Sequence, residues 1–430
     1  MTVASSVGAG RSDTGRRRTQ NEDGFFVDDS LGLYVVSDGM GGHAAGEVAS
    51  ATAIAAVREV VEAARATVAG VRSGTEARDA LSRLAGEAVL TANRRVHELA
   101  TSDRGKAGMG CTVTLVLVAG DVAAMGHVGD SRLYLRRSGR TDKLSSDHTI
   151  LAELVRSGVM ELGEASKGHP LAHVLSRAVG TQPHVEVETL LFDLAGGEQL
   201  LLCSDGLSDY LDDLAPVDAA LAAVDASESP PDAAHLDQVA ATLVAFANES
   251  GGHDNITVVA VQVGADERAT ARASGLSQRF QALSSVFLFE GLSVPSASRI
   301  LEAFSAVEHP PEAVVIEAGD DIDALLVVVK GDYRIEDPEG QVVGRLGPGS
   351  YLGLTALMRA RPARATLRAE TKGGTMLRLR GAGLRRLVRR SPHLGLAILD
   401  RLGRTLSGDL ERSYAQRSGE REAVAVSERF

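Results

Sequence analysis

Two apolar segments of the chain end in the same tripeptide, and this repetition constrains the fold more than any other feature. The run Leu33–Val36 leads into Ser37-Asp38-Gly39, and the run Leu200–Cys203 leads into Ser204-Asp205-Gly206. A short apolar run that stops at a turn signal is typical of a buried strand. The strand holds the aspartate rigidly, and the glycine lets backbone or ligand come close. Both segments therefore predict a carboxylate displayed at the end of a strand.

Further carboxylates lie beside strand-like runs in the same way. Asp130 comes after the apolar run 122–128, the pair Glu22-Asp23 precedes the run 24–27, and Asp254 precedes the run 256–263. A single Asp-Gly indicates only a turn, but five such placements favour a shared site. Carboxylates without a cysteine or histidine set at ligand spacing suit the oxygen-preferring ions Mg²⁺ or Mn²⁺ and not Zn²⁺.

Such a cluster of carboxylates would support hydrolysis at phosphorus. Two divalent ions that share carboxylates activate a water and stabilise an in-line displacement, so no side-chain nucleophile is required. Arg18 lies a few residues before Glu22 and Asp23, where a guanidinium is a natural anchor for a phosphate dianion. The alternative interpretation of Arg16-Arg17-Arg18 is a solvated basic patch.

Three other hydrolase signatures are missing from the sequence. Neither Cys111 nor Cys203 has an arginine six residues later, which disfavours a cysteine-loop phosphatase. The glycine-rich stretch 39–46 lacks the lysine of a nucleotide-binding loop, and no Gly-x-Ser-x-Gly occurs. Both cysteines lie in apolar runs, as buried reduced thiols do, and we therefore expect a cytoplasmic protein.

The length of 430 residues predicts two domains. Over 1–264, strand-like runs are mixed with helical patterns at 46–66, 75–99 and 235–249, and short turns favour antiparallel pairing in an α+β fold. The stretch 265–282 is polar, rich in small residues and aperiodic, which is linker composition. We expect a second domain over 283–412 and a polar tail over 413–430.

Composition and charge exclude two classes of partner. The net charge of −12 argues against a general nucleic-acid-binding surface, and aromatic residues are only 3% of the chain, which disfavours base stacking. No apolar run approaches the roughly 20 residues that span a bilayer, and the N-terminal stretch lacks the apolar core of a secretory signal. We therefore expect neither a nucleic acid nor a membrane as partner.

The motifs over residues 5–263 resemble the bacterial type 2C (PPM) family of metal-dependent protein serine/threonine phosphatases. The resemblance rests on their number and order: Asp13-x-Gly15-x-x-Arg18-x-x-Asn21-Glu22-Asp23, Ser37-Asp38-Gly39-Met40-Gly41-Gly42-His43, Gly108-Met109-Gly110-Cys111-Thr112, His127-Val128-Gly129-Asp130-Ser131-Arg132, Leu144-Ser145-x-Asp147-His148, Ser204-Asp205-Gly206-Leu207 and His253-Asp254-Asn255-Ile256-Thr257-Val258. It implies a four-layer α-β-β-α sandwich of two antiparallel sheets. It also implies phosphoproteins carrying phosphoserine or phosphothreonine as substrates.

The resemblance implies a metal site with two Mn²⁺ or Mg²⁺ ions. Asp38 would bridge the two ions, the Gly39 carbonyl would bind one of them, and Asp205 and Asp254 would complete the pair. Asp130 would help Asp205 to hold a third, weaker ion.

The resemblance also implies roles for the residues around the metals. Glu22 and Asp23 would hold metal-bound waters, Arg18 would bind the substrate phosphate, and Asn255 would support the site from beside Asp254. The segment 153–180 would form a flap over the site, where substrates are chosen.

Residues 284–405 resemble a cyclic-nucleotide-binding β-roll with flanking helices. The matching segments are 285–292, Gly319-Asp320 with 324–329, Tyr351-Leu352-Gly353 and 362–369. Helical patterns at 381–390 and 392–412 follow the roll. We therefore expect a smaller β-roll domain after the sandwich.

The nucleotide-binding cassette of this second domain departs from the family pattern at two positions. Related cassettes place a glutamate after the glycine, to bind the ribose hydroxyl, but Gly353 is followed by Leu354. They place an arginine three residues before the threonine, where Thr366 has Ala363, while Arg364 lies one residue late. A one-residue slip in a strand points the side chain to the opposite face. The sequence predicts weak or no binding of cyclic AMP or cyclic GMP.

Three interpretations of the whole protein remain open. It is an active phosphatase with a regulatory C-terminal domain, a catalytically silent scaffold, or a sensor in which a cyclic nucleotide gates the phosphatase. The presence of Asp38, Asp205 and Asp254 favours the active enzyme. Residues 359–404 hold 12 Arg and one Lys against Glu370 and Asp400, a net charge of +11, which suits another anion or an acidic partner. A solvated basic surface is the alternative.

Overall fold

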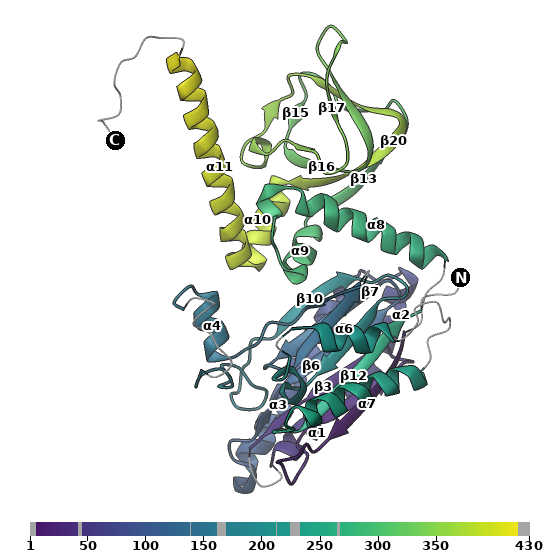
Figure 1. Cartoon of the computed structure of the whole chain (residues 1–430), viewed down its shortest axis with the longest axis vertical. Helices are drawn as coiled ribbons and strands as arrows, with labels where there is room; N and C mark the ends of the chain where they lie inside the picture. Colours follow the sequence, from purple (N-terminus) through teal and green to yellow (C-terminus); the bar gives the residue numbers. More distant parts are fainter. Residues whose placement is uncertain are drawn as a thin grey trace. The chain divides into compact units, whose positions relative to one another are not determined.

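The computed structural model describes residues 6–41, 45–137, 139–160, 169–211, 213–223, 233–264 and 267–419. The chain divides into two compact units, Met1–Leu276 and Ser277–Phe430 (Figure 1). Each unit has its own apolar core and is described by itself.

The first unit contains two five-stranded sheets in which all neighbouring strands are antiparallel. The first sheet has the order β1 (Ser6–Asp13), β12 (Ile256–Val263), β11 (Gln199–Cys203), β8 (Arg132–Arg137) and β9 (Arg140–Lys143). The second has the order β10 (Glu188–Asp193), β7 (Val122–Val128), β6 (Val113–Ala119), β3 (Leu33–Ser37) and β2 (Gly24–Asp28). The predicted antiparallel pairing is confirmed.

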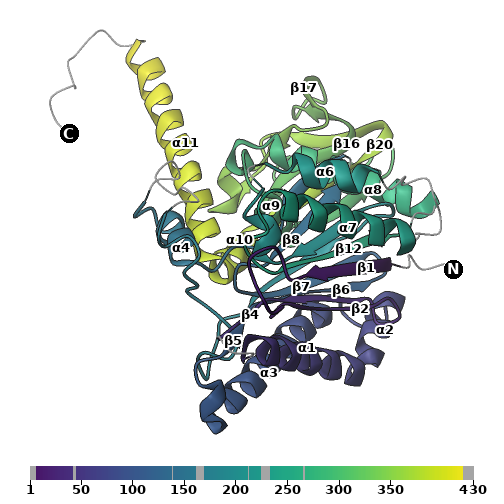
Figure 2. The ribbon, with the colours of Figure 1, turned by 60° about the horizontal axis from the view of Figure 1, so that its bottom comes forward.

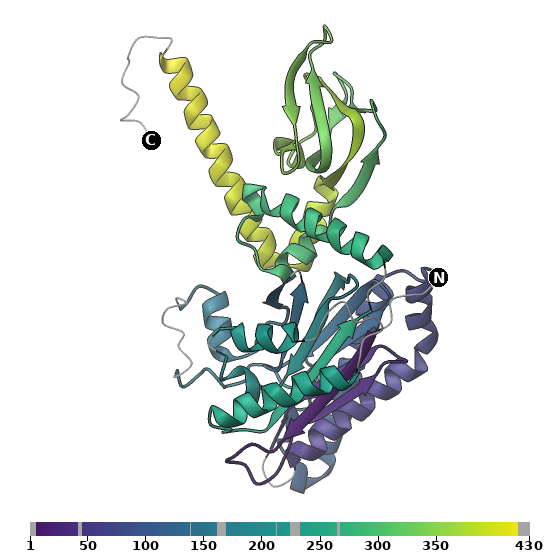
Figure 3. The ribbon, with the colours of Figure 1, turned by 45° about the vertical axis from the view of Figure 1, so that its right-hand side comes forward.

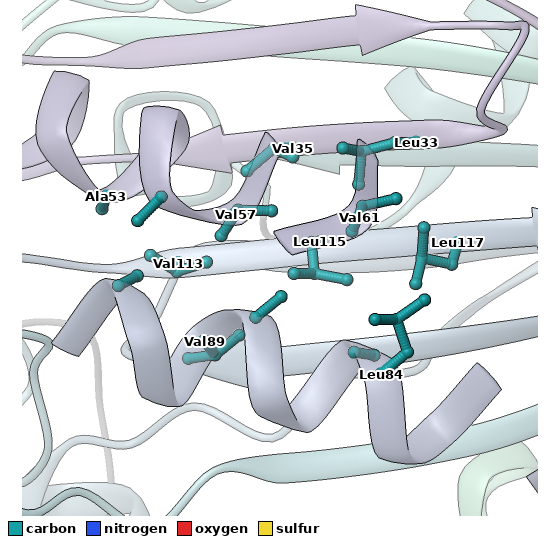
Figure 4. Packing of buried hydrophobic residues seen from close by; sticks show 14 of the residues in the cluster. Leu33, Val35, Ala53, Val57, Val61, Leu84, Val89, Val113, Leu115 and Leu117 are labelled. Atoms are coloured by element: carbon teal, nitrogen blue, oxygen red, sulfur yellow. The ribbon is translucent and has the colours of Figure 1, made fainter. Parts of the chain in front are cut away.

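Helices cover the outer face of each sheet, which gives the four layers α-β-β-α seen in Figure 2. Helices α1 (Ala45–Ala63), α2 (Arg65–Ser73) and α3 (Asp79–Ser102) lie on the second sheet, and α6 (Ala215–Ala222) and α7 (Ala233–Glu249) lie on the first. Figure 4 shows Val57 of α1 beside Val35 of β3, and Leu84 of α3 pointing toward Leu117 of β6. The predicted sandwich is confirmed.

The two sheets pack face to face because the central strands are apolar on both sides. All residues of β6 and β7 are buried, as expected for strands covered by helices on one face and by a second sheet on the other. Close contact between the sheets requires a glycine in β1, since a Cβ on Gly8 would lie 2.4 Å from the ring of Tyr34 in β3. The Tyr34 hydroxyl donates to Ser6 Oγ at 2.9 Å, so its buried polar end is satisfied.

Short elements at the strand ends carry the residues of interest. The strand pair β4 (Gly39–Met40) and β5 (Gly110–Cys111) follows β3, and the 3-10 turn η1 (Arg104–Lys106) follows α3. Helix α4 (Ile150–Arg156) begins the predicted flap, of which residues 161–168 lie outside the described residues. Helix α5 (Asp205–Ser208) begins directly after β11.

The second unit is a β-roll with helices at one end (Figure 3). Its main sheet has the order β13 (Ser305–His309), β20 (Thr366–Arg380), β16 (Ala324–Glu336) and β17 (Val342–Leu346), with β14 (Val314–Ile316) on β20 and β18 (Tyr351–Leu352) on β16. Strands β15 (Asp321–Ile322) and β19 (Arg361–Pro362) form a separate pair. The flanking elements are η2 (Phe287–Phe289), α9 (Val294–Leu301), η3 (Thr355–Leu357), α10 (Gly381–Arg390), α11 (Pro392–Gly419) and the part of α8 (Glu267–Ser284) that follows Leu276.

Alternation along β16 builds two apolar clusters in this unit. Leu326 and Val328 point into the roll beside Tyr333. Leu325 and Val327 point the other way, to the flanking helices. This is the period-two pattern of a strand with both faces covered, and the predicted β-roll with flanking helices is confirmed.

Two expected boundary segments contain regular structure. The predicted linker 265–282 is largely helical, because α8 spans Glu267–Ser284. Helix α11 runs to Gly419, into the predicted tail, and residues 420–430 lie outside the described residues. Over the part of the chain that the structure describes, no helix is both long and apolar enough to cross a lipid bilayer.

Candidate metal centre and active site

Asp38 lies at the junction of β3 and β4, where the neighbouring strand β6 begins. Its backbone N–H donates to Thr112 Oγ1 at 2.9 Å, and its carbonyl accepts from Thr112 N at 2.8 Å. Ser37 Oγ also donates to the Thr112 carbonyl at 2.6 Å. Because Thr112 bonds to both the N–H and the carbonyl of Asp38, the backbone that carries the Asp38 carboxylate is held in place.

Asp205 occupies the matching place after β11, and the serine before it holds another acid. Ser204 Oγ donates to Asp23 Oδ2 at 2.7 Å and accepts from Thr257 N at 2.9 Å. The two Ser-Asp-Gly segments therefore use their serine in the same way, to tie the site to a neighbouring strand. The carboxyl groups of Asp38 and Asp205 lie within hydrogen-bonding distance of each other.

The loop before β2 is held against the start of β12 by Asn255, which is 5% exposed. Asn255 Nδ2 donates to the carbonyls of Thr14 at 3.0 Å and Gln20 at 2.9 Å, and Oδ1 accepts from Glu22 N at 2.9 Å. The Asn255 backbone N–H donates to Asp254 Oδ1 at 2.8 Å. One amide side chain thus fixes both ends of the segment that carries Arg18.

Arg18 lies at the rim of the carboxylate cluster. Its Nη2 donates to Asp254 Oδ2 at 2.6 Å, and its side chain is 51% exposed. Hydrogen bonding and charge attraction from Asp254 raise the pKa of Arg18. A permanently charged, half-exposed guanidinium beside the carboxylates is available to an incoming anion.

Two glycines make room for the Glu22 segment. A Cβ on Gly46 would lie 2.6 Å from the Glu22 carboxyl carbon, and a Cβ on Gly39 would lie 2.1 Å from the Gly46 carbonyl oxygen. Gly39 N donates to the Glu22 carbonyl at 3.2 Å. A side chain at either glycine would displace the carboxylate that the sequence assigned to the site.

Asp130 follows β7 and lies near Asp209, an acid that the sequence motifs did not single out. The negative charges of Asp205 and Asp209 add to the effect of burial in raising the pKa of Asp130. Ligand atoms of Asp205, Asp209 and His173 all lie within 4.8 Å of one another, and His173 Nδ1 is 3.5 Å from Asp209 Oδ2. The signal for Asp209 was its place four residues after Asp205, since residues four apart share one face of a helix.

Four of these carboxyl groups have raised pKa values. Burial, with smaller effects from neighbouring acids, raises the pKa of Asp23 to about 7, of Asp130 to about 8 and of Asp205 to about 6. Burial followed by the charges of Asp23, Asp205 and Asp130 raises the pKa of Asp38 well above its usual range. Without a cation, the four carboxyl groups are therefore buried too close together for all of them to be ionised at neutral pH.

This charge surplus is what a pair of divalent cations would neutralise. Among the described residues, the buried atoms Asp23 Oδ1 and Asp205 Oδ1 have no hydrogen-bond partner. Buried carboxylate oxygens that lack donors are the ligands that hard cations prefer. The donor set is carboxylate and carbonyl oxygen, so the residues present fit Mg²⁺ or Mn²⁺.

The residues of the predicted nucleotide-binding cassette lie in the second unit. Ala363 is buried and Arg364 is exposed. Leu354 packs against the apolar cluster under the helices. Gly353 adopts φ +83°, and a Cβ there would lie 2.2 Å from the Ala324 carbonyl oxygen. Thr366 Oγ1 accepts from Ala318 N at 3.1 Å, so this hydroxyl oxygen already has a backbone donor.

Comparison with known proteins agrees with the geometry of both units. Residues 10–248 match the family Protein phosphatase 2C, and residues 306–391 match the family Cyclic nucleotide-binding domain. The chain is 32% identical over 255 residues to serine/threonine phosphatase stp of Listeria welshimeri, a stretch that covers 59% of this chain and 94% of that protein.

Two mycobacterial comparisons extend this result. The serine/threonine protein phosphatase PstP of Mycobacterium tuberculosis is 36% identical over 255 residues, which cover 59% of this chain and 44% of that protein. The crystal structure of the Mycobacterium tuberculosis phosphatase PstP/Ppp matches with a TM-score of 0.50 and 32% identity, covering 61% of this chain and all of that one. The chain belongs to the protein phosphatase 2C family of metal-dependent serine/threonine phosphatases, and it carries a domain of the cyclic nucleotide-binding type after the catalytic one.

Proposed function

We propose that the protein hydrolyses phosphoserine and phosphothreonine in phosphoproteins, with two divalent cations held by Asp38, the Gly39 carbonyl, Asp205 and Asp254. The observation that supports this most strongly is the convergence of strand-end carboxyls whose burial and mutual repulsion raise their pKa values. When bound, the cations would supply Lewis acidity and lower the pKa of a coordinated water.

The surrounding residues would bind and orient the reactants. Arg18 would pair with the phosphate dianion at the rim of the site, since its guanidinium is charged and half-exposed. Glu22 and Asp23 would accept hydrogen bonds from ordered waters and so fix the direction of attack. Asn255 would keep the segment that carries Arg18 and Glu22 in register with Asp254.

A third, weaker cation would bind at Asp130 and Asp205, with Asp209 as an additional ligand. The mutual charge effects among these three acids support this assignment. The His173 imidazole, 3.5 Å from Asp209, would favour Mn²⁺ over Mg²⁺ at this position, because Mg²⁺ prefers oxygen ligands.

The second unit would serve as a regulatory domain that does not depend on cyclic AMP or cyclic GMP. Leu354 lies in the apolar cluster and cannot accept a hydrogen bond from a ribose hydroxyl. Ala363 takes the inward place of the expected arginine while Arg364 is exposed. The basic stretch 359–404 would instead bind another anion or an acidic partner. We place the protein in the cytoplasm because Cys111 and Cys203 are buried and unpaired.

The direct test is hydrolysis of a phosphothreonine peptide by the full chain with Mn²⁺ or Mg²⁺. We expect turnover that excess EDTA abolishes and that Mn²⁺ restores. Asp237→Asn is the matched control for an Asp205→Asn variant, since Asp237 pairs with Arg11 on the surface of α7. Full activity in excess EDTA, or equal loss in both variants, would contradict the proposal.

A further inference from the structure

His148 lies where two parts of the active site meet. It precedes α4, the first helix of the flap, and it packs under the turn that carries Asp130. The residue is 1% exposed, so its contacts are with protein. The metal ligands and the phosphate-binding residues assigned above do not include it.

One residue holds both polar groups of the Gly129 backbone. The His148 backbone N–H donates to the Gly129 carbonyl at 2.8 Å, and the His148 ring Nδ1 accepts from Gly129 N at 3.1 Å. Because Nδ1 is the acceptor, the ring proton of the neutral imidazole is on Nε2, which faces Glu188 Oε2 at 3.6 Å. The turn that displays Asp130 is therefore anchored on its inner side by His148.

The other side of Gly129 has no free space either. Gly129 adopts φ +113°, and a Cβ there would lie 2.6 Å from Thr112. Thr112 holds the Asp38 backbone, and its Oγ1 is 2.7 Å from Ser131 Oγ. Any shift of the Gly129 peptide would therefore be transmitted to both Asp38 and Asp130.

His148 and its neighbour Ile150 join the segment before α4 to the segment 174–176 of the predicted flap. The His148 carbonyl accepts from Ser176 N at 2.9 Å, and Ile150 N donates to the Val174 carbonyl at 2.8 Å. Thr149 Oγ1 caps α4 by accepting from Ala152 N at 3.2 Å. The segments 148–150 and 174–176 are thus hydrogen-bonded to each other next to His148.

A second buried histidine keeps the first in place. The rings of His127 and His148 lie 4.7 Å apart between centroids. His127 Nε2 donates to the Ser146 carbonyl at 3.0 Å, so in the neutral ring Nδ1 accepts from Thr114 Oγ1 at 2.9 Å. Ser146 in turn donates to Glu188 through both its N–H and its hydroxyl.

We propose that His148 is a positioning residue whose Nδ1 sets the Asp130 turn and the flap as one unit. Loss of the Nδ1 acceptor would leave the Gly129 N–H unpaired and free the turn. Because the His148 backbone bonds to both Gly129 and Ser176, movement of the freed turn would also loosen the attachment of the flap. The inference rests on the proposed phosphatase activity for its functional consequence. The role of His148 in holding the Asp130 turn can be tested without measuring hydrolysis.

Three substitutions separate the possible roles of the ring. His148→Asn keeps an oxygen acceptor at the place of Nδ1 but nothing at the place of Nε2. His148→Gln does the reverse, since its amide reaches the place of Nε2. His148→Leu keeps volume alone. If the Leu variant does not fold, the Asn and Gln pair decides the question.

Two measurements on the full chain do not require turnover: amide hydrogen exchange in peptides covering 126–132 and 172–178, and calorimetric titration with Mn²⁺. We expect His148→Gln and His148→Leu to exchange faster in both peptides and to bind Mn²⁺ more weakly, while His148→Asn resembles the unsubstituted protein. In phosphopeptide hydrolysis we expect kcat/KM to fall by about 10²-fold in the Gln and Leu variants, as for a misplaced catalytic group.

Other patterns would overturn the proposal. An unchanged His148→Leu variant would show that the ring only fills space, and a loss in His148→Asn as large as that in His148→Gln would show that the Nδ1 acceptor is not what holds the turn. Unchanged exchange in His148→Gln would show that Nδ1 does not hold the turn. If the unsubstituted protein binds Mn²⁺ but hydrolyses no phosphopeptide, the proposed function fails, while the exchange results still decide the role of His148.

Discussion

Replacing Asn255 by alanine should reduce catalysis far more than it reduces global stability. The substitution removes three hydrogen bonds of 2.9–3.0 Å that tie the segment 14–22 to the start of β12. Each contributes about 1 kcal/mol net, and water replaces part of this at a half-exposed loop, so we expect a loss of about 1–3 kcal/mol. The loop can open without unfolding the sheets, so most of the loss should appear locally.

A loop that opens locally takes Arg18 and Glu22 out of register with the carboxylates. A cost of about 1–3 kcal/mol lowers the population of the closed loop relative to the open one by about 5- to 150-fold. We expect kcat/KM toward a phosphothreonine peptide to fall by up to this factor, according to how strongly the closed loop is favoured. The melting temperature should fall by only a few degrees.

Asn93 offers a control with the same chemistry at another place. It is 1% exposed, its Nδ2 donates to the carbonyls of Gln182 and Pro183, and its Oδ1 accepts from Gly180 N. Asn93→Ala therefore removes an equivalent set of bonds at the end of the predicted flap without touching the segment 14–22, and it serves as the reference for the loss of global stability. Unchanged kcat/KM in Asn255→Ala, or a fall in its melting temperature larger than that of Asn93→Ala, would refute the reasoning.

Four further outcomes are expected. Asp38→Asn or Asp205→Asn should remove nearly all turnover with an unchanged circular dichroism spectrum, because either change takes a charge from the proposed two-cation site; substantial residual activity would contradict the assignment. Arg18→Ala should raise KM and lower kcat/KM while calorimetry still shows Mn²⁺ binding, and unchanged kinetics would show that Arg18 does not contact the phosphate. In EDTA, the melting temperature should rise as the pH falls from 8 to 6, because the carboxyls of Asp205, Asp23 and Asp130, with pKa values of about 6, 7 and 8, take up protons in the folded chain over this range, whereas in the unfolded chain they stay ionised above about pH 4. Excess Mn²⁺ should abolish this trend. A metal-free protein that loses stability on acidification from pH 8 to 6 would contradict the prediction. Calorimetry of the full chain with cyclic AMP or cyclic GMP should show no dissociation constant in the micromolar range or below, because Leu354 leaves the ribose hydroxyl without a hydrogen-bond partner. A micromolar or tighter dissociation constant would make ligand gating of the phosphatase the better interpretation.

The local pattern of the sequence was sufficient for many of the elements and for the aspartates placed at strand ends. The strand at 122–128 and the helix at 381–390 have the bounds that the sequence indicated, and the strands at 33–37 and 199–203 extend the apolar runs 33–36 and 200–203 by one residue each. Periodicity reports which face of an element is buried, and a turn signal reports where it ends, so both can be read over a few residues. The sequence alone therefore indicates that an aspartate after such a run stands at the end of a strand.

Contacts between distant segments needed the tertiary structure. Asn255 bonds to residues that precede it by more than 230 positions, and Ser204 reaches Asp23 across the sandwich. His148 meets Gly129 through both its ring and its backbone, and it meets Ser176 through its backbone carbonyl. The raised pKa values arise only when the carboxyls are buried together. The sequence by itself determined which groups stand at the strand ends, whereas only the fold decided which of them share a site, because burial and hydrogen-bond pairing depend on distances that no local pattern encodes.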